Sequence, residues 1–414
     1  MKPAFETACV IGLGYIGLPT AAIIASRGVS VVGVDINQRA VELIKKGQIH
    51  IVEPDLDTLV NGAVATGKLK ATTEPSPADV FIVAVPTPFT DGNKPDLKYV
   101  RAAAESIASV LEKGNLVIIE STSPVGTTER VSGWLADLRG DLTFPHQAGE
   151  DADICLAYSP ERVLPGRILI ELVRNDRVVG GMTPRCAERA AELYRMVIEG
   201  ECFVTTARTA ELVKLSENAF RDVNIAFANE LSLICDRLDL DVWEVAELAN
   251  RHPRVEILKP GPGVGGHCIA VDPWFIVDSA PEEATLIRTA RNVNDAKPAH
   301  IVAGVLRACE RFAQPRIVCL GLSYKADIDD LRESPAVEIV RLIAESAREV
   351  VAVEPHVAEL PEALAGSGVE LVGLDDALHN ADIVVLLTDH REFKTIDRQR
   401  LAGKIVFDTR GIWR

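Results

Sequence analysis

The alternation of apolar and polar segments along the chain predicts the elements of an α/β protein. A short apolar run at residues 7–11 is typical of a buried strand, a glycine-rich turn follows at 12–17, and residues 18–27 have the Ala- and Ile-rich pattern of a helix. A second apolar run, Val29–Val34, ends at Asp35. Because strand, turn, helix and strand follow one another directly, we expect a βαβ unit at this end of the chain.

The glycine spacing of the turn predicts a dinucleotide-binding site. The pattern is G-x-G-x-x-G, in which Gly12 makes the turn, Gly14 lets backbone amides approach a pyrophosphate and Gly17 lets the helix pack on the strand. The acid that follows about 20 positions later, Asp35, suits a ribose hydroxyl and repels a 2′-phosphate, so NAD is favoured over NADP. The predicted cofactor contacts in the turn are Gly12, Gly14, Tyr15, Ile16 and Gly17. The alternative is a glycine-rich turn without a ligand.

Two further strands are predicted to end in polar turns. They are the apolar runs Val80–Val85 and Leu116–Ile119. Ligands of open α/β sheets bind beyond the carboxyl ends of the strands, so Thr87 and Thr122, which lie in the following turns, are candidate contacts. The alternative is ordinary turn and capping chemistry, in which threonine is common.

Residues 207–238 are predicted to form one long amphipathic helix. Apolar positions recur at helical spacing from Ala210 to Cys235. A helix of this kind can join two domains, and it can also form a dimer seam. Lys214 and Asn218 lie four residues apart and share a face, where they offer a cation and an amide to an oxyanion. The alternative is a solvated lysine beside an incidental polar neighbour.

The C-terminal part repeats the N-terminal design imperfectly. Strands are predicted at Arg316–Leu320, Glu349–Val353, Ile383–Leu387 and Ile405–Phe407, and a helix at Val337–Ser346. The first turn again begins with a glycine, Gly321, but Ser323 and Ala326 replace the second and third glycines of the fingerprint. This half is therefore expected to be Rossmann-like without binding a dinucleotide.

Three cations near the strand ends of this half suit a phosphate-bearing ligand. They are Lys325, Arg332 and Arg410, and ammonium and guanidinium groups are common partners of phosphate. The alternative is that they are surface cations in a chain that contains 44 lysines and arginines.

Length, charge and cysteine usage limit the class of protein. A chain of 414 residues exceeds one ordinary hydrophobic core. We therefore predict an α/β fold with two Rossmann-like doubly wound domains joined by a long central helix and a helical domain, with boundaries at 1–206, 207–300 and 301–414. The net charge of −16 argues against general binding to nucleic acid or to a membrane surface. No apolar run has the length of a bilayer span, no secretory signal pattern precedes the first strand, and the eight cysteines form no short paired framework. A cytoplasmic protein with reduced thiols is expected.

One cysteine ends a loop almost without side chains. Cys268 follows the sequence Gly-Pro-Gly-Val-Gly-Gly-His at 261–267, and a thiol so presented is a candidate nucleophile, with Asp272 placed to position a base or water. The first alternative is a buried cysteine that acts as a small hydrophobe, although this loop offers little core. Zinc is a weaker alternative, because His267 and Cys268 are adjacent and no C-x-x-C or H-x-x-x-H motif accompanies them. No metal site is predicted.

Seven short motifs follow one another along the chain. They are Gly12–Gly17, Pro86–Pro88, Ser121–Thr127, Ser159-Pro160-Glu161-Arg162, Lys214 with Asn218, Gly265–Asp272, and Lys325 with Arg332–Pro335. In this order they resemble the family of UDP-sugar dehydrogenases, relatives of UDP-glucose dehydrogenase, over nearly the whole chain. The resemblance implies an enzyme that uses NAD twice to oxidise the C6 alcohol of a nucleotide sugar to a carboxylate.

The resemblance also implies roles for individual residues. Cys268 would form a thiohemiacetal and then a thioester, and Lys214 and Asn218 would stabilise the oxyanions. Thr122, Glu161 and Asp272 would hold the hydrolytic water and manage its proton. Implied substrate contacts are Glu161, Arg162, Lys214, Asn218, Arg254, His267, Lys325 and Arg410, and Thr87, Thr122 and Arg332 join the implied cofactor contacts. The long helix would form the core of a homodimer.

The loop sequence from Gly261 to Phe275 is similar to the branch of this family that acts on N-acetylated sugars. The implied substrate is UDP-N-acetyl-D-mannosamine, used for bacterial surface polysaccharide, and the alternative is UDP-N-acetylglucosamine, which differs only at C2. Departures from the UDP-glucose pattern, among them Pro165 in place of a glutamate and Val271 in place of a lysine, move the implied substrate away from glucose.

Two other classes of function remain as alternatives. A single-step hydroxyacid dehydrogenase would also have an N-terminal Rossmann domain and a long helix, but it needs neither Cys268 nor a second nucleotide-binding domain. A non-enzymatic NAD-binding regulator is disfavoured by the group of cysteine, lysine, asparagine and aspartate.

Overall fold

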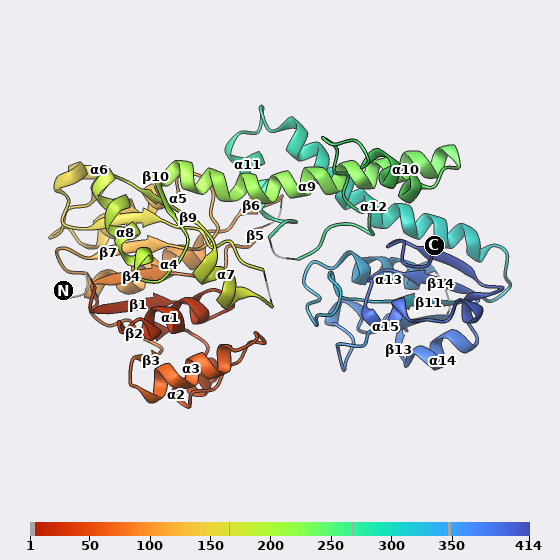
Figure 1. Cartoon of the computed structure of the whole chain (residues 1–414), viewed down its shortest axis with the longest axis horizontal. Coiled ribbons are helices and arrows are strands. Elements are labelled where there is room, and N and C mark those ends of the chain that lie inside the picture. The colour runs from red at the N-terminus through yellow and green to blue at the C-terminus, as the bar shows by residue number, and fades with distance from the viewer. Residues whose placement is uncertain (1–4, 91, 165, 267, 347–348) are drawn as a thin grey trace. The chain divides into compact units, whose positions relative to one another are not determined.

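The computed structural model describes residues 5–90, 92–164, 166–266, 268–346 and 349–414. The chain divides into two compact units, Met1–Glu217 with Trp274–Ser279, and Asn218–Pro273 with Ala280–Arg414. Helix α9 (Ala207–Leu238) runs from the first unit into the second (Figure 1). His267 and Pro165, two positions that the sequence singles out, lie outside the described residues.

The first unit is built around an eight-stranded sheet. Its strands are β1 (Thr7–Ile11), β2 (Ser30–Val34), β3 (Leu69–Thr72), β4 (Val80–Val83), β7 (Leu116–Ile119), β8 (Cys155–Tyr158), β9 (Arg177–Gly181) and β10 (Cys202–Thr206), in the order β10-β9-β8-β7-β4-β1-β2-β3. Neighbouring strands are parallel except β8 and β9. The strand order reverses between β1 and β4, which is where ligands of doubly wound sheets bind.

Helices cover both faces of this sheet (Figure 1). They are α1 (Gly17–Ser26), α2 (Gln38–Lys45), α3 (Leu56–Ala65), α4 (Lys98–Ile107), α5 (Thr127–Leu138), α6 (Pro145–Ala148), α7 (Ile168–Arg174) and α8 (Pro184–Arg195), and a two-residue pair, β5 (Phe89–Thr90) with β6 (Lys94–Pro95), stands apart. Alternate residues of β1 point to opposite cores: Ala8 and Val10 pack with α1, α3 and α8, whereas Cys9 and Ile11 pack with α4 and α5. Both faces of the strand are apolar because both are covered.

The second unit holds a five-stranded parallel sheet in the order β13-β12-β11-β14-β15. Its elements are α10 (Val242–Ala249), α11 (Asp272–Ser279, which ends in the first unit), α12 (Thr285–Cys309), β11 (Arg316–Leu320), α13 (Pro335–Ser346), β12 (Glu349–Val353), β13 (Glu370–Leu371), α14 (Leu374–His379), β14 (Ile383–Leu386), α15 (Arg391–Lys394) and β15 (Ile405–Asp408). Helices α12 and α13 pack on one face, and α14 with Phe393 of α15 packs on the other. The order repeats the 3-2-1-4 arrangement of the first sheet.

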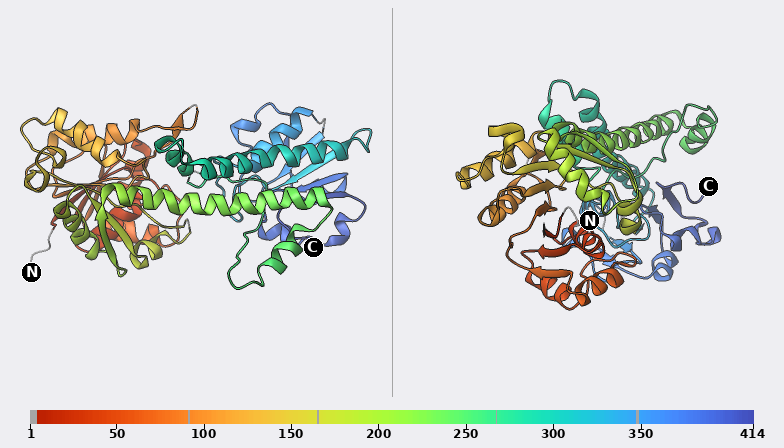
Figure 2. Two further views of the ribbon diagram at one scale, coloured as in Figure 1. Left: turned by 90° about the horizontal axis from the view of Figure 1, so that it is seen from above. Right: turned by 60° about the vertical axis from the view of Figure 1, so that its left-hand side comes forward.

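The C-terminal part of α9 packs along α12, as the left view of Figure 2 shows in green and teal. The contact is polar in its centre: Asn229 Nδ2 donates to Asn294 Oδ1 at 2.8 Å, and Lys297 donates to Ser232. These side chains are buried. Since buried polar groups are costly unless they are bonded, this pairing fixes the register of the two helices.

The predicted α/β class with two Rossmann-like sheets and a long central helix is confirmed. Strands β1, β7, β11 and β12 and helix α9 have the predicted bounds. The predicted strand 80–85 ends earlier, at Val83, because the Val85 amide donates to the Ser121 side chain and Pro86 has no N–H. Helix α13 begins two residues before its predicted start, since Pro335 suits the first helical turn.

Candidate active site

The turn after β1 depends on two glycines. Gly12 has φ +92°, and a Cβ there would lie 2.4 Å from the Ala84 carbonyl oxygen. A Cβ at Gly17 would lie 1.8 Å from the Gly12 oxygen, so neither residue can carry a side chain unless the backbone moves. Apart from its two neighbours in the chain, no described residue comes within 4 Å of the ideal Cβ of Gly14. This side of the turn is therefore open to a ligand.

Asp35 is fixed at the edge of the same turn. Its Oδ2 accepts the Leu13 N–H at 2.8 Å and its Oδ1 accepts the Asn37 N–H at 2.8 Å. A carboxylate has further lone pairs, which a ribose hydroxyl can use. Helix α1 begins at Gly17 with no side-chain capping bond among the described residues, so its first amides and its positive dipole end suit a pyrophosphate. The predicted residues therefore fit a dinucleotide.

Thr87 and Thr122 are in contact, and the contact uses the backbone of Thr122 and not its side chain. The Thr87 hydroxyl donates to the Thr122 carbonyl oxygen at 2.5 Å. The loop beyond Thr122 is held by Glu211 of α9, whose carboxylate accepts the Gly126 N–H at 2.6 Å and the Thr128 N–H at 2.8 Å. Sequence reasoning missed Glu211, although a carboxylate on the apolar face of a helix was a usable signal.

Glu161, which follows β8, is almost fully buried. Burial raises the pKa of its carboxyl group to about 7, Lys214 and Arg177 oppose the shift, and Glu120 adds to it. Its Oε1 has no hydrogen-bond partner within the part of the chain that the structure describes. Lys214 Nζ donates to the Glu161 backbone oxygen at 2.7 Å. This carboxyl group can therefore gain or lose a proton near neutral pH, beside a cation.

A buried ion pair lies near Glu161. Arg177 pairs with Glu120, whose Oε1 also accepts the Tyr194 hydroxyl at 2.7 Å. Arg162, the neighbour of Glu161, binds Glu217 Oε1 at 2.6 Å. Sequence reasoning missed Glu120 and Arg177, because they lie about 57 positions apart and only the sheet brings them together.

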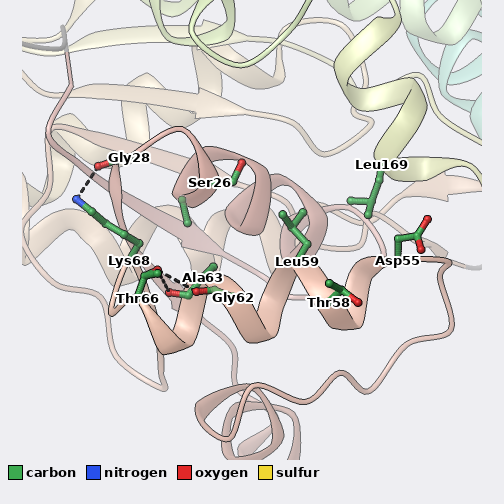
Figure 3. Close-up of a pocket in the computed structure, with 11 residues that line it drawn as sticks. Ser26, Gly28, Asp55, Thr58, Leu59, Gly62, Ala63, Thr66, Lys68 and Leu169 are labelled. Atoms are coloured by element: carbon green, nitrogen blue, oxygen red, sulfur yellow. Dashed lines mark hydrogen bonds between the residues drawn. The ribbon is translucent and has the colours of Figure 1, made fainter.

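A groove elsewhere in this unit is separate from these residues. Its volume is about 890 Å³, and Figure 3 shows it between the end of α1, helix α3 and Leu169. Its rim is fixed by Lys68, whose Nζ donates to the Gly28 oxygen at 2.6 Å. The lining includes neither the Gly12–Gly17 turn nor Asp35. The groove is therefore not the predicted cofactor site.

In the second unit, the glycine loop before Cys268 packs tightly against the segment 324–335. A Cβ at Gly265 would lie 2.5 Å from the Glu333 carbonyl oxygen, and one at Gly266, which has φ +82°, would lie 2.9 Å from the Tyr324 ring. The Gly266 N–H donates to the Arg332 carbonyl oxygen at 3.1 Å. The glycines are required here because backbone and ring approach closely.

The start of this loop is anchored by a buried polar network. The Gly261 N–H donates to Asn229 Oδ1 at 2.9 Å, and Asn229 is bonded to Asn294. Asn294 Nδ2 donates to Asp222 Oδ1 at 2.8 Å, and Asp222 pairs with Arg291 at 2.6 Å. Sequence reasoning missed this network, since an asparagine on a long helix gives no signal that it will hold a distant loop.

Cys268 is exposed, whereas the other seven cysteines are buried or half-buried. The Asp272 N–H donates to the Cys268 carbonyl oxygen at 2.9 Å, and Asn218 Nδ2 donates to Asp272 Oδ2 at 2.5 Å. Asn218 and Asp272 are buried. The structure therefore brings three of the predicted catalytic residues together: Cys268 and Asp272 lie on one backbone segment, and Asn218 of α9 bonds to Asp272.

The predicted cations of the C-terminal half lie in different surroundings. Arg410 pairs with Asp389 at 2.9 Å, and a Cβ at Gly261 would lie 2.7 Å from its Nη1. Arg332 binds Asp330 at 2.6 Å, and Lys325 is half-buried. Arg254 lies in an exposed segment after α10. Arg410 and Arg332 are thus next to the two ends of the glycine loop.

The turn after β11 has the same backbone geometry as the turn after β1, but a histidine of the protein lies against its carboxylate. Gly321 has φ +93°, and Glu354 Oε2 accepts the Leu322 and Ser323 N–H groups at 2.7 and 3.0 Å, as Asp35 does for Leu13. His390 Nε2 then lies 3.1 Å from the same oxygen. The carboxylate oxygen at this turn is thus already engaged by a side chain of the protein, whereas no such histidine bond is found for Asp35 among the described residues.

Comparison with protein families matches three consecutive domains of the UDP-glucose/GDP-mannose dehydrogenase family. The NAD binding domain matches residues 6–198, the central domain 208–296 and the UDP binding domain 318–414. The chain belongs to this family. It is an NAD-dependent UDP-sugar dehydrogenase. The family's NAD binding domain includes Gly12–Gly17 and Asp35, and its UDP binding domain includes Lys325, Arg332 and Arg410.

Several similar members of the family have names that refer to acetamido sugars. The chain is 62% identical over 410 residues to an NDP-N-acetyl-D-galactosaminuronic acid dehydrogenase of Ralstonia nicotianae, covering 99% of this chain and 96% of that protein. It is 58% identical over 423 residues to a UDP-N-acetyl-D-mannosamine dehydrogenase of Yersinia pestis, covering 99% and 100%. A UDP-D-ManNAc dehydrogenase structure from Pyrococcus horikoshii superposes with a TM-score of 0.89 at 41% identity, covering 99% and 96%. Within the described residues, each helix is too short or too polar to span a bilayer.

Proposed function

We propose that this dehydrogenase oxidises the C6 alcohol of UDP-N-acetyl-D-mannosamine to a carboxylate. We further propose that the enzyme works in the cytoplasm and that its uronate product is used for surface polysaccharide. The observation that carries the proposal is the exposed Cys268 thiol at the end of a tightly packed glycine loop, beside the buried Asn218–Asp272 pair. Relatives named UDP-N-acetyl-D-mannosamine dehydrogenase are 57–58% identical to this chain. A simple alcohol dehydrogenase would not need the thiol.

The reaction proceeds in two oxidations and one hydrolysis. NAD, when bound, supplies the acceptor for one hydride in each oxidation, so two molecules are consumed per sugar. After the first oxidation Cys268 adds to the C6 aldehyde, forming a C–S bond and a thiohemiacetal. Loss of the second hydride and a proton gives a thioester. Water then breaks the C–S bond, which yields the carboxylate and restores the thiol.

Charge develops on the C6 oxygen in both addition steps, and the chain supplies two donors for it. Lys214 provides a cation, and the Asn218 amide has two N–H groups, of which Asp272 accepts one. We assign these donors to the oxyanion, where one such donor typically contributes about 3 kcal/mol.

Hydrolysis needs a base, and Glu161 is suited to that task. Its pKa near 7 lets it be ionised in part of the neutral range. We assign Thr122 and Asp272 to hold the water, and the Asp272 carboxylate to share in managing its proton. The proposed substrate contacts are Arg162, Arg254, His267, Lys325 and Arg410, and the proposed cofactor contacts outside the glycine turn and Asp35 are Thr87, Thr122 and Arg332.

The proposal is tested by NADH formation with several nucleotide sugars. We expect UDP-N-acetyl-D-mannosamine to have the highest kcat/KM, with two NADH released per sugar. UDP-N-acetylglucosamine and UDP-glucose should be poorer substrates. One NADH per sugar would eliminate the thioester route, and fastest turnover of UDP-glucose would overturn the choice of branch.

A galacto-configured acetamido sugar is the second candidate. It is favoured by the 62% identity to the Ralstonia nicotianae protein, whose name refers to N-acetyl-D-galactosaminuronic acid. The chemistry at C6 is the same for both sugars, so the residues proposed above keep their roles. Including UDP-N-acetylgalactosamine in the same assay decides between the two, since each configuration predicts a different best substrate.

The pH dependence of the hydrolytic step should report the ionisation of Glu161. Because burial raises its pKa to about 7, the group is neutral and inactive as a base below that pH, and it is ionised and active above it. We expect the deacylation rate to rise between roughly pH 6 and pH 8. Glu161→Gln should remove this rise and lower the rate. The exposed Glu188→Gln variant is the control, and an unchanged profile in Glu161→Gln would assign the proton to another group.

A stripe of exposed apolar side chains on α9 supports a homodimer. Phe220, Phe227 and Ile234 recur every seven residues and are 70%, 57% and 46% exposed, so they share one face of the helix. We propose that a second copy covers this face. The double variant Phe220→Glu with Phe227→Glu should halve the mass measured by light scattering. Leu286→Glu, an equally exposed site on α12, should leave it unchanged. A full-size assembly in the double variant would rule out this face.

A further inference from the structure

Four potential metal ligands meet at the carboxyl edge of the C-terminal sheet. Asp327 lies in the loop after β11 and His356 follows β12. His390 directly precedes α15, the helix that follows β14 (Figure 1), and Glu392 lies in that helix. One ligand atom from each lies within 4.8 Å of the others. Their positions in sequence span more than 60 residues, so no short motif indicates them.

The role of His390 in this cluster is decided by its hydrogen bonds. Its Nδ1 accepts the Asp327 N–H at 2.9 Å, so the proton is on Nε2, which donates to Glu354 at 3.1 Å. Both ring nitrogens are therefore engaged. His390 orients the loop that carries Asp327, and its ring packs against His356 with centroids 4.8 Å apart.

His356 presents the opposite situation. Its Nε2 is buried and has no hydrogen-bond partner among the described residues. It lies 3.9 Å from Asp327 Oδ1 and 4.0 Å from Glu392 Oε2. The His356 backbone N–H is fixed by Glu354 Oε1 at 3.1 Å. One imidazole nitrogen and two carboxylates thus converge on a common point, with no direct bond between them.

We propose that His356, Asp327 and Glu392 bind a divalent cation of the zinc type. Imidazole and carboxylate groups are suitable ligands for such an ion, and a tetrahedral site places its ligand atoms about 3.4 Å apart. The His356 nitrogen needs to move roughly 0.5 Å closer to each of the two carboxylate oxygens to reach that geometry. His390 and Glu354 serve as the orienting groups behind the ligands. The ion would tie together the loops after β11, β12 and β14, including the one that carries Lys325.

Arg391 is the competing cation at this position. Its Nε lies 3.2 Å from Asp327 Oδ2, but its side chain is 79% exposed, so it can move into solvent at little cost. The simplest alternative to a metal is a network in which a protonated His356 bridges the two carboxylates. The two descriptions differ in whether a metal binds with defined stoichiometry.

Titration calorimetry with ZnCl₂ on the metal-free full chain tests the site. We expect one zinc ion to bind per chain. His356→Ala should abolish this binding, and Glu392→Gln should weaken the affinity at least about tenfold. His379→Ala, an exposed histidine of the same domain, should bind like the parent. Zinc should raise the unfolding temperature of the parent and of His379→Ala, but not that of His356→Ala.

The thiols of the chain are an alternative source of zinc binding, and cobalt(II) separates them. A site made of imidazole and carboxylates gives d–d absorption without the intense thiolate-to-metal band in the near ultraviolet. We expect the former spectrum in the parent and its loss in His356→Ala. Absence of binding in the parent, a thiolate spectrum, or unchanged affinity in both His356→Ala and Glu392→Gln would overturn the proposal. Glu392 is exposed, so its variant is expected to fold.

Discussion

Replacing Cys268 by alanine should lower the conversion of UDP-N-acetyl-D-mannosamine to the uronate by about 10³-fold or more, as is usual when a covalent nucleophile is removed. The thiol is exposed at the end of a glycine loop and is not part of a core, so the variant should keep its fold. Without a C–S bond, neither a thiohemiacetal nor a thioester can form. The measurement is NADH released per enzyme over time, together with the intact mass of the protein after mixing with substrate.

The control for this variant is another cysteine of the same unit. Cys309 is half-buried at the end of α12, and Cys309→Ala should retain turnover within about threefold, since it removes one small side chain far along the sequence from the loop. A covalent adduct of the sugar should appear in the parent and in Cys309→Ala, but not in Cys268→Ala. Substantial formation of uronate by Cys268→Ala would mean that hydration of the aldehyde, without a thioester, carries the second oxidation.

Much of the fold follows from local sequence signals, because those signals have local physical causes. The strands at Thr7–Ile11 and Arg316–Leu320 are uninterrupted apolar runs, and each is followed by a glycine with positive φ. Such runs are typical of parallel strands that are covered on both faces. Both sheets have the same 3-2-1-4 strand order at their centres, which agrees with the imperfect repeat in the sequence.

The antiparallel pairing of β8 with β9 was not predicted, because nothing in either apolar run encodes the direction of its neighbour. The supporting residues of the site were missed for a similar reason. Glu211 holds a loop 83 to 85 residues away, and Asn229 holds Gly261 from 32 residues away. These bonds depend on tertiary packing, so the identity of the residue alone does not reveal them.

The residues at the first glycine turn were easier to predict than those that hold the surrounding loops. Gly12, Gly17 and Asp35 have roles that backbone geometry imposes, and the structure shows the close approaches and bonds that require them. Glu161 was predicted only through a resemblance, and its buried environment gives an independent reason for acid–base chemistry. The role of a residue can be predicted from sequence where one short segment must meet a strict steric condition.

Asp272→Asn should arrest the reaction at a later stage than Cys268→Ala. The side chain is buried and accepts the Asn218 amide at 2.5 Å, and an asparagine oxygen can accept the same bond. The fold and the Asn218 position should therefore be preserved, while the negative charge is lost. We expect kcat to fall by about 10²- to 10⁴-fold, the usual range for loss of a general acid–base group.

If Asp272 acts on the hydrolytic water, the thioester should accumulate in this variant. A rapid burst of two NADH per active site should precede the slow steady state, and intact mass spectrometry should detect the sugar on Cys268. The matched control is Asp278→Asn, an exposed position on the same helix, which should show neither the burst nor the adduct beyond the parent level. A slow variant with no burst would instead place Asp272 in the first oxidation or in the addition of the thiol. A kcat within about threefold of the parent would remove Asp272 from the catalytic set, because loss of a working acid–base group costs far more than that.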